Sequence, residues 1–224
     1  MRDISIASSP RDAAVCPIFE LCEDMPRPYR ELEARYEWSR CSFVSVSQLV
    51  TAAVAGKSMA GQGAKVDLGE PAAKVMGYAQ RMDFFRYSGM DVPERFSRHP
   101  EDGRFVPLHR VSSQEDVEIV AHALVDLITN HLGVDESVPD ALNLAFGAIL
   151  DNVLQHADSP FGGATGAQWF PTMGFIELCV ADGGRGIAAS MARNPDYGDL
   201  SEDELVLKAF ELNAGRVRSE CRLG

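Results

Sequence analysis

Apolar residues recur at strand and helix spacing from about residue 41 onward, and they divide the chain into two regions. In the first region, SFVSVSQLVTAAVAG predicts a short strand that runs into a helix, AKVDLG predicts a second strand, and AAKVMGYAQRMDFFRYSG predicts a second helix. Together these segments predict a small β-α-β-α unit over residues 41–91. Residues 1–40 have polar, arginine-rich spacing, which predicts a poorly ordered lead-in with one short helix from Tyr29.

The second region, residues 112–224, opens with signals for two helices. Ser112 and Glu115 form a capping box, and apolar residues follow it at helical intervals. A second helix is predicted from near Pro139 to about His156, because proline is tolerated in a first turn. The apolar stripes of the two helices comprise Val117, Val120, Leu124, Leu127 and Leu132, and then Leu142, Phe146, Ile149 and Val153.

A β-hairpin and a glycine-rich turn are predicted next. AQWF and FIELCVAD flank a turn from Pro171 to Gly174, and the second strand is apolar enough for a central position in a sheet. That strand ends in the sequence DGGRGI. Ser201 and Glu204 then form another capping box, for a helix that reaches about Leu212.

The distribution of charge supports two domains. Residues 1–110 hold 15 acidic and 15 basic groups, whereas residues 111–224 hold 18 acidic and 6 basic groups and so carry the whole net charge of −12. Turn-forming residues between the two regions predict a linker over residues 92–111. Neither half has the basic face that duplex nucleic acid requires, so nucleic acid is not an expected partner.

Composition also predicts the compartment. No run of about 18 apolar residues occurs, and the first residues carry charge where a signal peptide would be apolar. The five cysteines are scattered and lack CxxC spacing, which argues against a disulfide framework and against a zinc site. We therefore expect a cytoplasmic protein with reduced thiols and no membrane association.

Two features of the second region are candidates for chemistry. On the helix, Ala148, Asn152 and His156 form one row, because residues four apart share a face, while Asp151 points about 100° away. The second feature is the turn from Asp182 to Ile187. It fits a loose Rossmann pattern, but no strand follows it, so that interpretation is rejected. A simple tight turn would explain only one of its three glycines.

Taken together, these motifs resemble a known family. Asn152-x-x-x-His156 followed by Asp182-x-Gly184-x-Gly186 resembles the N box and first glycine box of the Bergerat-fold ATPases. This GHKL superfamily includes DNA gyrase, heat-shock chaperones and histidine kinases. NVLQHA with VADGGRGI is most similar to the branch of anti-sigma-factor serine kinases and histidine kinases, over residues 112–212. The resemblance implies an α/β sandwich with a mixed sheet and helices on one face.

The resemblance also implies a role for each residue. Asn152 would supply an oxygen to Mg²⁺, which explains how a stretch without Lys or Arg from Val111 to Gly184 could hold ATP. Asp182 would accept a hydrogen bond from the adenine amino group. Gly184 and Gly186 would let the backbone approach the nucleotide, and Ile187 would pack against the base. His156 would lie near the phosphates or the lid, or would instead be hydrogen-bonded within the helix layer.

The first region, residues 41–91, resembles the sulfate-transporter and anti-sigma-antagonist (STAS) fold, mainly in its helix ending in YAQRMDFFRYSGM. In that family a serine at the start of the first helix accepts phosphate, and Ser45 and Ser47 lie near the matching position. No DxSG-type motif surrounds them, so helix capping is the favoured role.

Two departures from the family pattern bear on activity. Ala148 occupies the position where the family has a glutamate that serves as general base, and Asp151 lies on a different face of the helix. No second glycine box follows the first, which predicts either a truncated protein or the loss of half of the phosphate cradle.

Three hypotheses for function follow. The first is an ATP- and Mg²⁺-binding regulator with weak or absent phosphotransfer, acting through a protein partner in a signalling or sigma-factor pathway. The second is a catalytically dead interaction module that has lost nucleotide binding. The third is an active ATPase or kinase that uses another base, and Ala148 makes this the least favoured.

Overall fold

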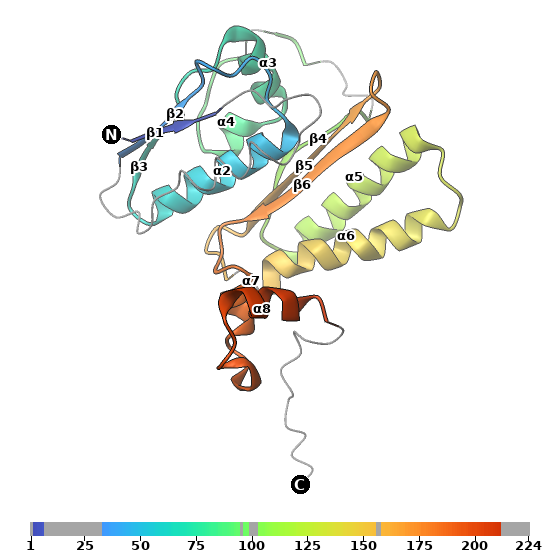
Figure 1. Ribbon diagram of the computed structural model, residues 1–224. Helices are drawn as coiled ribbons and strands as arrows, with labels where there is room; N and C mark the ends of the chain where they lie inside the picture. The colour runs from blue at the N-terminus through green and yellow to red at the C-terminus, as the bar shows by residue number, and fades with distance from the viewer. Residues whose placement is uncertain (1, 7–32, 95, 99–102, 156–157, 212–224) are drawn as a thin grey trace.

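The computed structural model describes residues 2–6, 33–94, 96–98, 103–155 and 158–211 (Figure 1). It is a mixed α/β structure with two three-stranded sheets. The strands are β1 (Arg2–Ser5), β2 (Glu33–Glu37), β3 (Lys65–Asp67), β4 (Phe105–Val111), β5 (Gly163–Phe170) and β6 (Phe175–Asp182). The helices are α2 (Val46–Gly61), α3 (Ala73–Arg81), α4 (Phe84–Tyr87), α5 (Gln114–Leu132), α6 (Val138–Gln155), α7 (Ile187–Met191), the 3-10 helix η1 (Pro195–Tyr197) and α8 (Glu202–Ala209).

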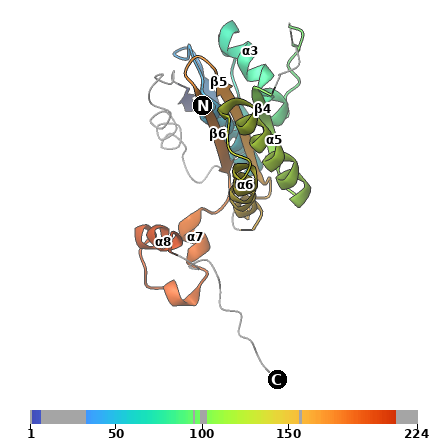
Figure 2. The ribbon, with the colours of Figure 1, turned by 90° about the vertical axis from the view of Figure 1, so that its right-hand side faces the viewer.

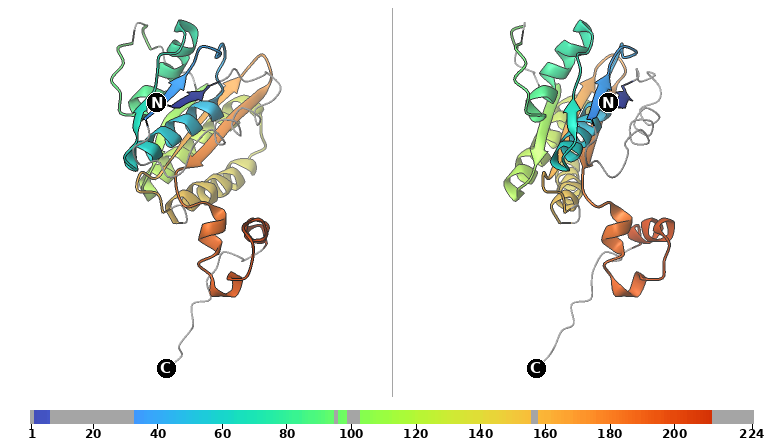
Figure 3. Two further views of the ribbon diagram at one scale, coloured as in Figure 1. Left: turned by 60° about the vertical axis from the view of Figure 1, so that its left-hand side comes forward. Right: turned by 90° about the vertical axis from the view of Figure 1, so that its left-hand side faces the viewer.

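The first sheet is parallel, with strand order β1-β2-β3, and it packs against α2. Residues on nearly every side of α2 are buried, including Val46, Leu49, Val50 and Met59. A helix that is apolar all round is suited to a position between two layers. α2 occupies such a position, because its other side packs against β5 and β6 of the second sheet (Figure 3).

The second sheet is antiparallel, with order β4-β5-β6 (Figure 2). Side chains alternate between its faces along each strand. On β6, Ile176, Leu178 and Val180 pack into the core formed with α5 and α6, whereas Cys179 and Ala181 pack into the core that contains α2. Helices therefore cover both faces of this sheet.

Polar contacts also join the first region to the second sheet. The Tyr78 hydroxyl donates to Oε1 of Gln168 at 2.6 Å, and the Leu108 amide donates to the Met82 carbonyl at 2.8 Å. Burial, and after it the Glu177 carboxylate, raises the pKa of the Tyr78 hydroxyl, which favours its neutral, donating form. Hydrogen bonds and a shared apolar core thus connect the regions that the sequence assigns to separate domains.

Several expectations need correction. The predicted lead-in, residues 1–40, contains β1 and β2, while Tyr29 lies outside the described residues. The short strand predicted immediately before α2 is not formed, because residues 41–45 contain no strand. The first strand of the β-α-β-α order is instead β2, which ends at Glu37. The predicted linker, residues 92–111, contains β4, and the mixed sheet expected for the second region is antiparallel, with helices on both faces.

Smaller differences concern position. β5, not β6, is the central strand of the second sheet. The cap of α5 is Ser113 with Asp116, one residue after the predicted pair, and α8 ends at Ala209. On α6, Leu150 is fully buried, whereas Ile149 is 45% exposed. The predicted helix over residues 72–89 is divided into α3 and α4 at Asp83, whose φ of 56° lies in the left-handed region.

Ser45 caps α2, as the sequence predicted, and Glu177 of β6 adds a second cap from the neighbouring sheet. Ser45 and Gln48 form a reciprocal capping box. The Glu177 carboxylate accepts from the backbone amides of Val46 and Ser47 at 3.2 and 3.0 Å, and from the Ser47 hydroxyl at 2.6 Å. A carboxylate at a helix N-terminus also interacts favourably with the helix dipole. Glu177 therefore fixes the start of α2 to β6.

We expect Glu177→Ala to lower the free energy of unfolding by about 2–4 kcal/mol, because hydrogen bonds to a charged acceptor are lost and two helix amides lose a partner. Urea denaturation measures this loss. Glu118→Ala, which removes an exposed carboxylate from α5, should change stability by less than about 0.5 kcal/mol. Equal stability of the two variants would mean that Glu177 does not anchor α2.

In the part of the chain that the structure describes, no helix combines the length and apolar character needed to span a bilayer.

Candidate functional site

The candidate residues lie at one end of the second sheet, where β6 leads into the glycine-rich turn. Asp182 is the last residue of β6 and is exposed. It follows Ile176, Leu178 and Val180 at a spacing of two, so its side chain lies on the face of the sheet that α5 and α6 cover. Asp182 Oδ1 accepts from the Gly184 amide at 2.9 Å, which holds the start of the turn.

Asn152 lies in the last turn of α6 and is exposed. Its neighbour Val153 is buried. The side chain of Val153 can pack closely on β5 because residue 163 is a glycine. A Cβ on Gly163 would lie 2.8 Å from Cγ1 of Val153 and 2.5 Å from the Ala181 carbonyl oxygen. Gly163 is also the residue paired with Asp182 across the β5–β6 ladder. The absence of a side chain at Gly163 thus lets the end of α6 pack beside Asp182.

The turn itself depends on glycine at two positions for different reasons. Gly186 has a φ of 81°, which side-chain-bearing residues rarely adopt, and the space around it is open. Gly183 approaches α2 closely, since a Cβ there would lie 3.0 Å from Cβ of Ser58. Ile187 begins α7 and is 51% exposed, which leaves its apolar side chain available to a planar ligand.

Five of the predicted site residues lie at this end of the sheet: Asn152 at the end of α6, and Asp182, Gly184, Gly186 and Ile187 in and beside the turn. Ala148, one turn before Asn152, is exposed on the same helix and offers no acid or base. His156 lies outside the described residues.

Sequence reasoning did not assign a role to Arg185, the central residue of the turn. It forms an ion pair with Asp158, and its Nε is buried without a hydrogen-bond partner. The signal was present in the sequence, because Arg185 is the first Lys or Arg after Arg110. Its guanidinium brings a positive charge to the turn, where Asp158 is its ion-pair partner.

Two further buried polar atoms near this end of the sheet also lack a partner. Oδ1 of Asp151 is buried next to Asn152 in the sequence, and Oγ1 of Thr165 is fully buried on β5, two residues from Gly163.

The metal-binding capacity of the described residues is limited. They contain no group of three or more His, Cys, Asp or Glu side chains that could hold a metal ion. Mg²⁺ commonly retains several waters and takes one or two protein ligands together with phosphate oxygens. Asn152 fits that pattern as a single oxygen donor, and such an ion would depend on the phosphates of a bound ligand.

A cavity of about 440 Å³ lies elsewhere, on the first region, and is lined by residues between Gln80 and Glu94. Arg98 forms ion pairs with two of the lining residues, Asp83 and Glu94. None of the candidate site residues lines this cavity, so it provides no binding space for them.

Comparison with known proteins yields no assignment. No model of a known family matches the chain, and no match was found among curated proteins or solved structures. The case for a site therefore rests on the residues and their geometry.

Proposed function

We propose that this chain is an ATP- and Mg²⁺-binding regulatory protein that resembles anti-sigma-factor serine kinases and histidine-kinase ATPase domains. The observation that carries the proposal is that the end of α6, which carries Asn152, packs against the strand residue paired with Asp182 at the end of β6, which brings together two motifs 30 residues apart. Gly163 and Val153 explain why these ends meet.

Each residue has a role that suits its surroundings. Asp182 would use its second carboxylate oxygen to accept from the adenine amino group, because Oδ1 already accepts from the Gly184 amide. Asn152 would be the oxygen ligand of Mg²⁺. Gly184 and Gly186 would allow the backbone to approach the nucleotide closely, and the exposed Ile187 would pack against the base. His156, outside the described residues, stays a candidate for a place near the phosphates or the lid, or for a hydrogen-bonded role within the helix layer.

Arg185 adds a feature that supports binding of an anion. Its guanidinium brings a positive charge to the turn between Asp182 and Ile187. The ion pair with Asp158 would compete with a phosphate group for this guanidinium. Such competition favours modest nucleotide affinity, as suits a regulator whose occupancy follows the nucleotide supply.

Regulation through a protein partner in a signalling or sigma-factor pathway, in the cytoplasm, completes the proposal. The second candidate is an interaction module without nucleotide binding. The Arg185–Asp158 ion pair favours it, because the cation nearest the turn is already neutralised within the protein.

The role of Asn152 can be tested by calorimetric titration of ATP with and without Mg²⁺. We expect Asn152→Ala to weaken binding about tenfold when Mg²⁺ is present and to leave metal-free binding unchanged, because only the metal-dependent contact is removed. Asn130→Ala, an exposed change on α5, is the matched control. An equal loss of ATP affinity with and without Mg²⁺ would show that Asn152 is not a ligand of the metal.

We expect almost no ATP hydrolysis by the wild-type chain, because Ala148 cannot act as a base and a general base commonly contributes about 100- to 10,000-fold. Ala148→Glu places a carboxylate one turn from Asn152 on an exposed helix face and should raise turnover modestly. Release of phosphate from ATP measures both rates. Wild-type turnover above about 1 per minute, still far below typical enzymes, would show that another residue serves as base.

A further inference from the structure

The last described elements, α7 and α8, form a small unit of their own beyond the end of β6 (Figures 1 and 2). Its core consists of Met191 and Leu205, with Tyr197 and Leu200 packed around them. Leu205 is only 4% exposed, so the inward face of α8 is fully used by this core.

The outward face of α8, together with Phe210 that caps its C-terminal end, carries a second set of apolar residues that the fold leaves uncovered. Val206, Leu207 and Phe210 are 36%, 71% and 81% exposed. Phe210 follows Val206 by four residues and Leu207 by three, and residues at these spacings are neighbours on one side of a helix. We call these three residues the α8 patch. Exposed apolar residues gathered on one face, unlike scattered ones, indicate an interaction surface.

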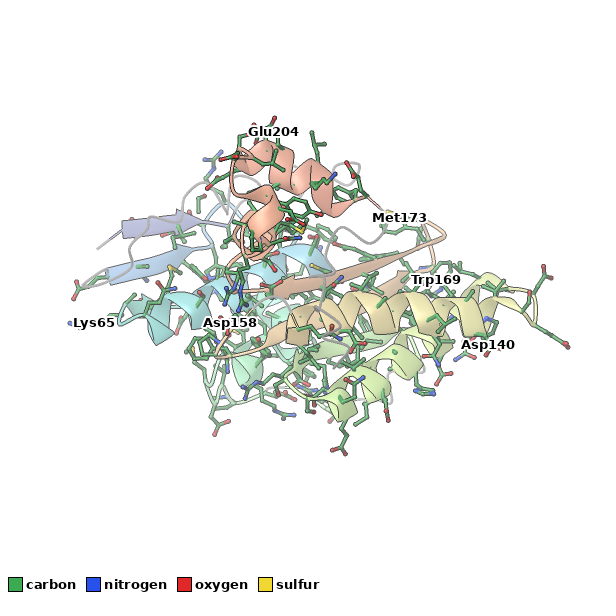
Figure 4. All side chains as sticks on the ribbon, turned by 90° about the horizontal axis from the view of Figure 1, so that it is seen from below. Lys65, Asp140, Asp158, Trp169, Met173 and Glu204 are labelled. Atoms are coloured by element: carbon green, nitrogen blue, oxygen red, sulfur yellow. The ribbon has the colours of Figure 1, made fainter. Side chains whose placement is uncertain are left out.

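Carboxylates flank the α8 patch. Glu202 lies four residues before Val206 and Asp203 lies four before Leu207, and both are exposed. Figure 4 labels Glu204 in the first turn of the same helix, on the side away from the sheets. Residues 187–211 hold six acidic groups against two basic ones, Arg193 and Lys208. Lys208, the basic residue on α8, forms an ion pair with Glu211, and its ammonium group lies over the Tyr197 ring.

We propose that the α8 patch binds a cationic amphipathic helix of a partner protein. The apolar stripe of such a helix would cover Leu207 and Phe210, and its flanking Lys and Arg residues would face the surrounding carboxylates. Helices that dock in this way use a few apolar anchors at positions i, i+3, i+4 and i+7. The complementary charges would then fix the orientation of the bound helix and raise its rate of association.

The same charges disfavour other occupants. A second copy of the chain related by a twofold axis would bring like carboxylate rims together, because a symmetric interface places the same surface on both sides. Anionic membranes and nucleic acid would be repelled by the same rim.

Binding at the α8 patch does not require nucleotide, so the test is made on the full chain without ATP or Mg²⁺. The probe is a fluorescein-labelled 18-residue peptide of leucine and lysine, with leucine at helical spacing. Fluorescence anisotropy compares it with a scrambled peptide of the same composition and with one in which glutamate replaces lysine. We expect saturable binding of the first probe only, weakened when salt is raised, because exposed charges are screened.

Two variants locate the binding. Leu207→Ser combined with Phe210→Ser should weaken binding tenfold or more, whereas Leu144→Ser should leave it within twofold. Leu144 is the matched control, since it is 77% exposed and lies on α6. All these residues are exposed, so the fold should be retained.

Equal binding by the serine double variant and wild type, or equal binding of the scrambled peptide, would overturn the proposal. So would self-association of the wild-type chain that the double variant abolishes in sedimentation velocity, because the patch would then serve a second copy. ATP affinity, measured separately, decides the proposed function, so the failure of one proposal is distinguishable from the failure of the other.

Discussion

Val50→Asp should unfold both halves of the molecule together. Val50 is fully buried on α2, and its Cγ2 lies 3.3 Å from the position that a Cβ on Gly166 of β5 would take. A carboxylate there would lie between α2 and the second sheet without a partner. Burying an unpaired charge costs several kcal/mol, about half or more of the stability of a typical domain, which is about 5–15 kcal/mol. Because the two regions share this core, we expect the loss to spread to α5 and α6.

Two tryptophans report on the two regions separately. Trp38 packs against Phe84 in the first region, and Trp169 stacks on His131 beside the second sheet, near the hairpin end that Met173 marks in Figure 4. Urea titrations of Trp38→Phe and Trp169→Phe backgrounds therefore follow each region alone. Both transitions should coincide, and Val50→Asp should shift both to lower urea.

Ile119→Asp provides the control for Val50→Asp, because it introduces the same charge at a position on α5 that is 53% exposed. It should cost less than about 1 kcal/mol. If Val50→Asp changes only the Trp38 transition and leaves the Trp169 midpoint unchanged, the two regions fold independently, as the charge distribution alone predicted.

Asp182→Asn should weaken ATP and ADP alike, by about 1.5–3 kcal/mol, or about 10- to 150-fold. Asn retains an oxygen that can accept from the Gly184 amide, so the turn should be preserved. The second carboxylate oxygen, however, becomes an NH₂ donor that faces the donating amino group of adenine. The loss should be independent of Mg²⁺, because the contact is made with the base.

Calorimetric titration with ATP and with ADP measures this effect. Asp140→Asn, at the opposite end of α6 and also exposed, removes the same charge and should leave both affinities unchanged. Equal nucleotide affinity in wild type and Asp182→Asn would reject the assignment of Asp182 to the adenine.

The sequence predicted those elements whose signals are local. The capping box at Ser201, the helix-capping role predicted for Ser45 or Ser47, and the apolar periods of α5 and α6 depend on residues within a few positions of one another. At the start of α5, two adjacent serines offered overlapping boxes. The structure uses Ser113, and Ser112 also donates to the Asp116 carboxylate that completes the box.

β4 was missed because its sequence, FVPLHRV, contains Pro107 and the polar residues His109 and Arg110, which are typical of a loop. Proline is tolerated in an edge strand and at a bulge, because no ladder amide is needed there. β4 is an edge strand, and its pairing with β5 is irregular between Val106 and His109, where Pro107 lies. Pairing with a segment more than 50 residues away was needed to identify it.

The candidate site was predictable in its parts but not in its assembly. Asp182 and Asn152 stand out as motif residues, yet their proximity depends on the register that pairs Gly163 with Asp182 and on the packing of Val153. The packing of Val153 against Gly163 joins segments from different elements, and a single sequence does not specify such a tertiary contact. The role of Glu177 as a cap for α2 was hidden for the same reason, since 130 residues separate it from Ser47.

Calorimetric titration of the wild-type chain with ATP, in Mg²⁺ and then in EDTA, tests the central claim most directly. We expect saturable binding of one ATP per chain in Mg²⁺, with a dissociation constant below about 1 mM, and weaker binding in EDTA. Absence of binding at millimolar ATP in Mg²⁺, from a chain whose urea transition shows it to be folded, would contradict nucleotide binding and leave the interaction module as the function.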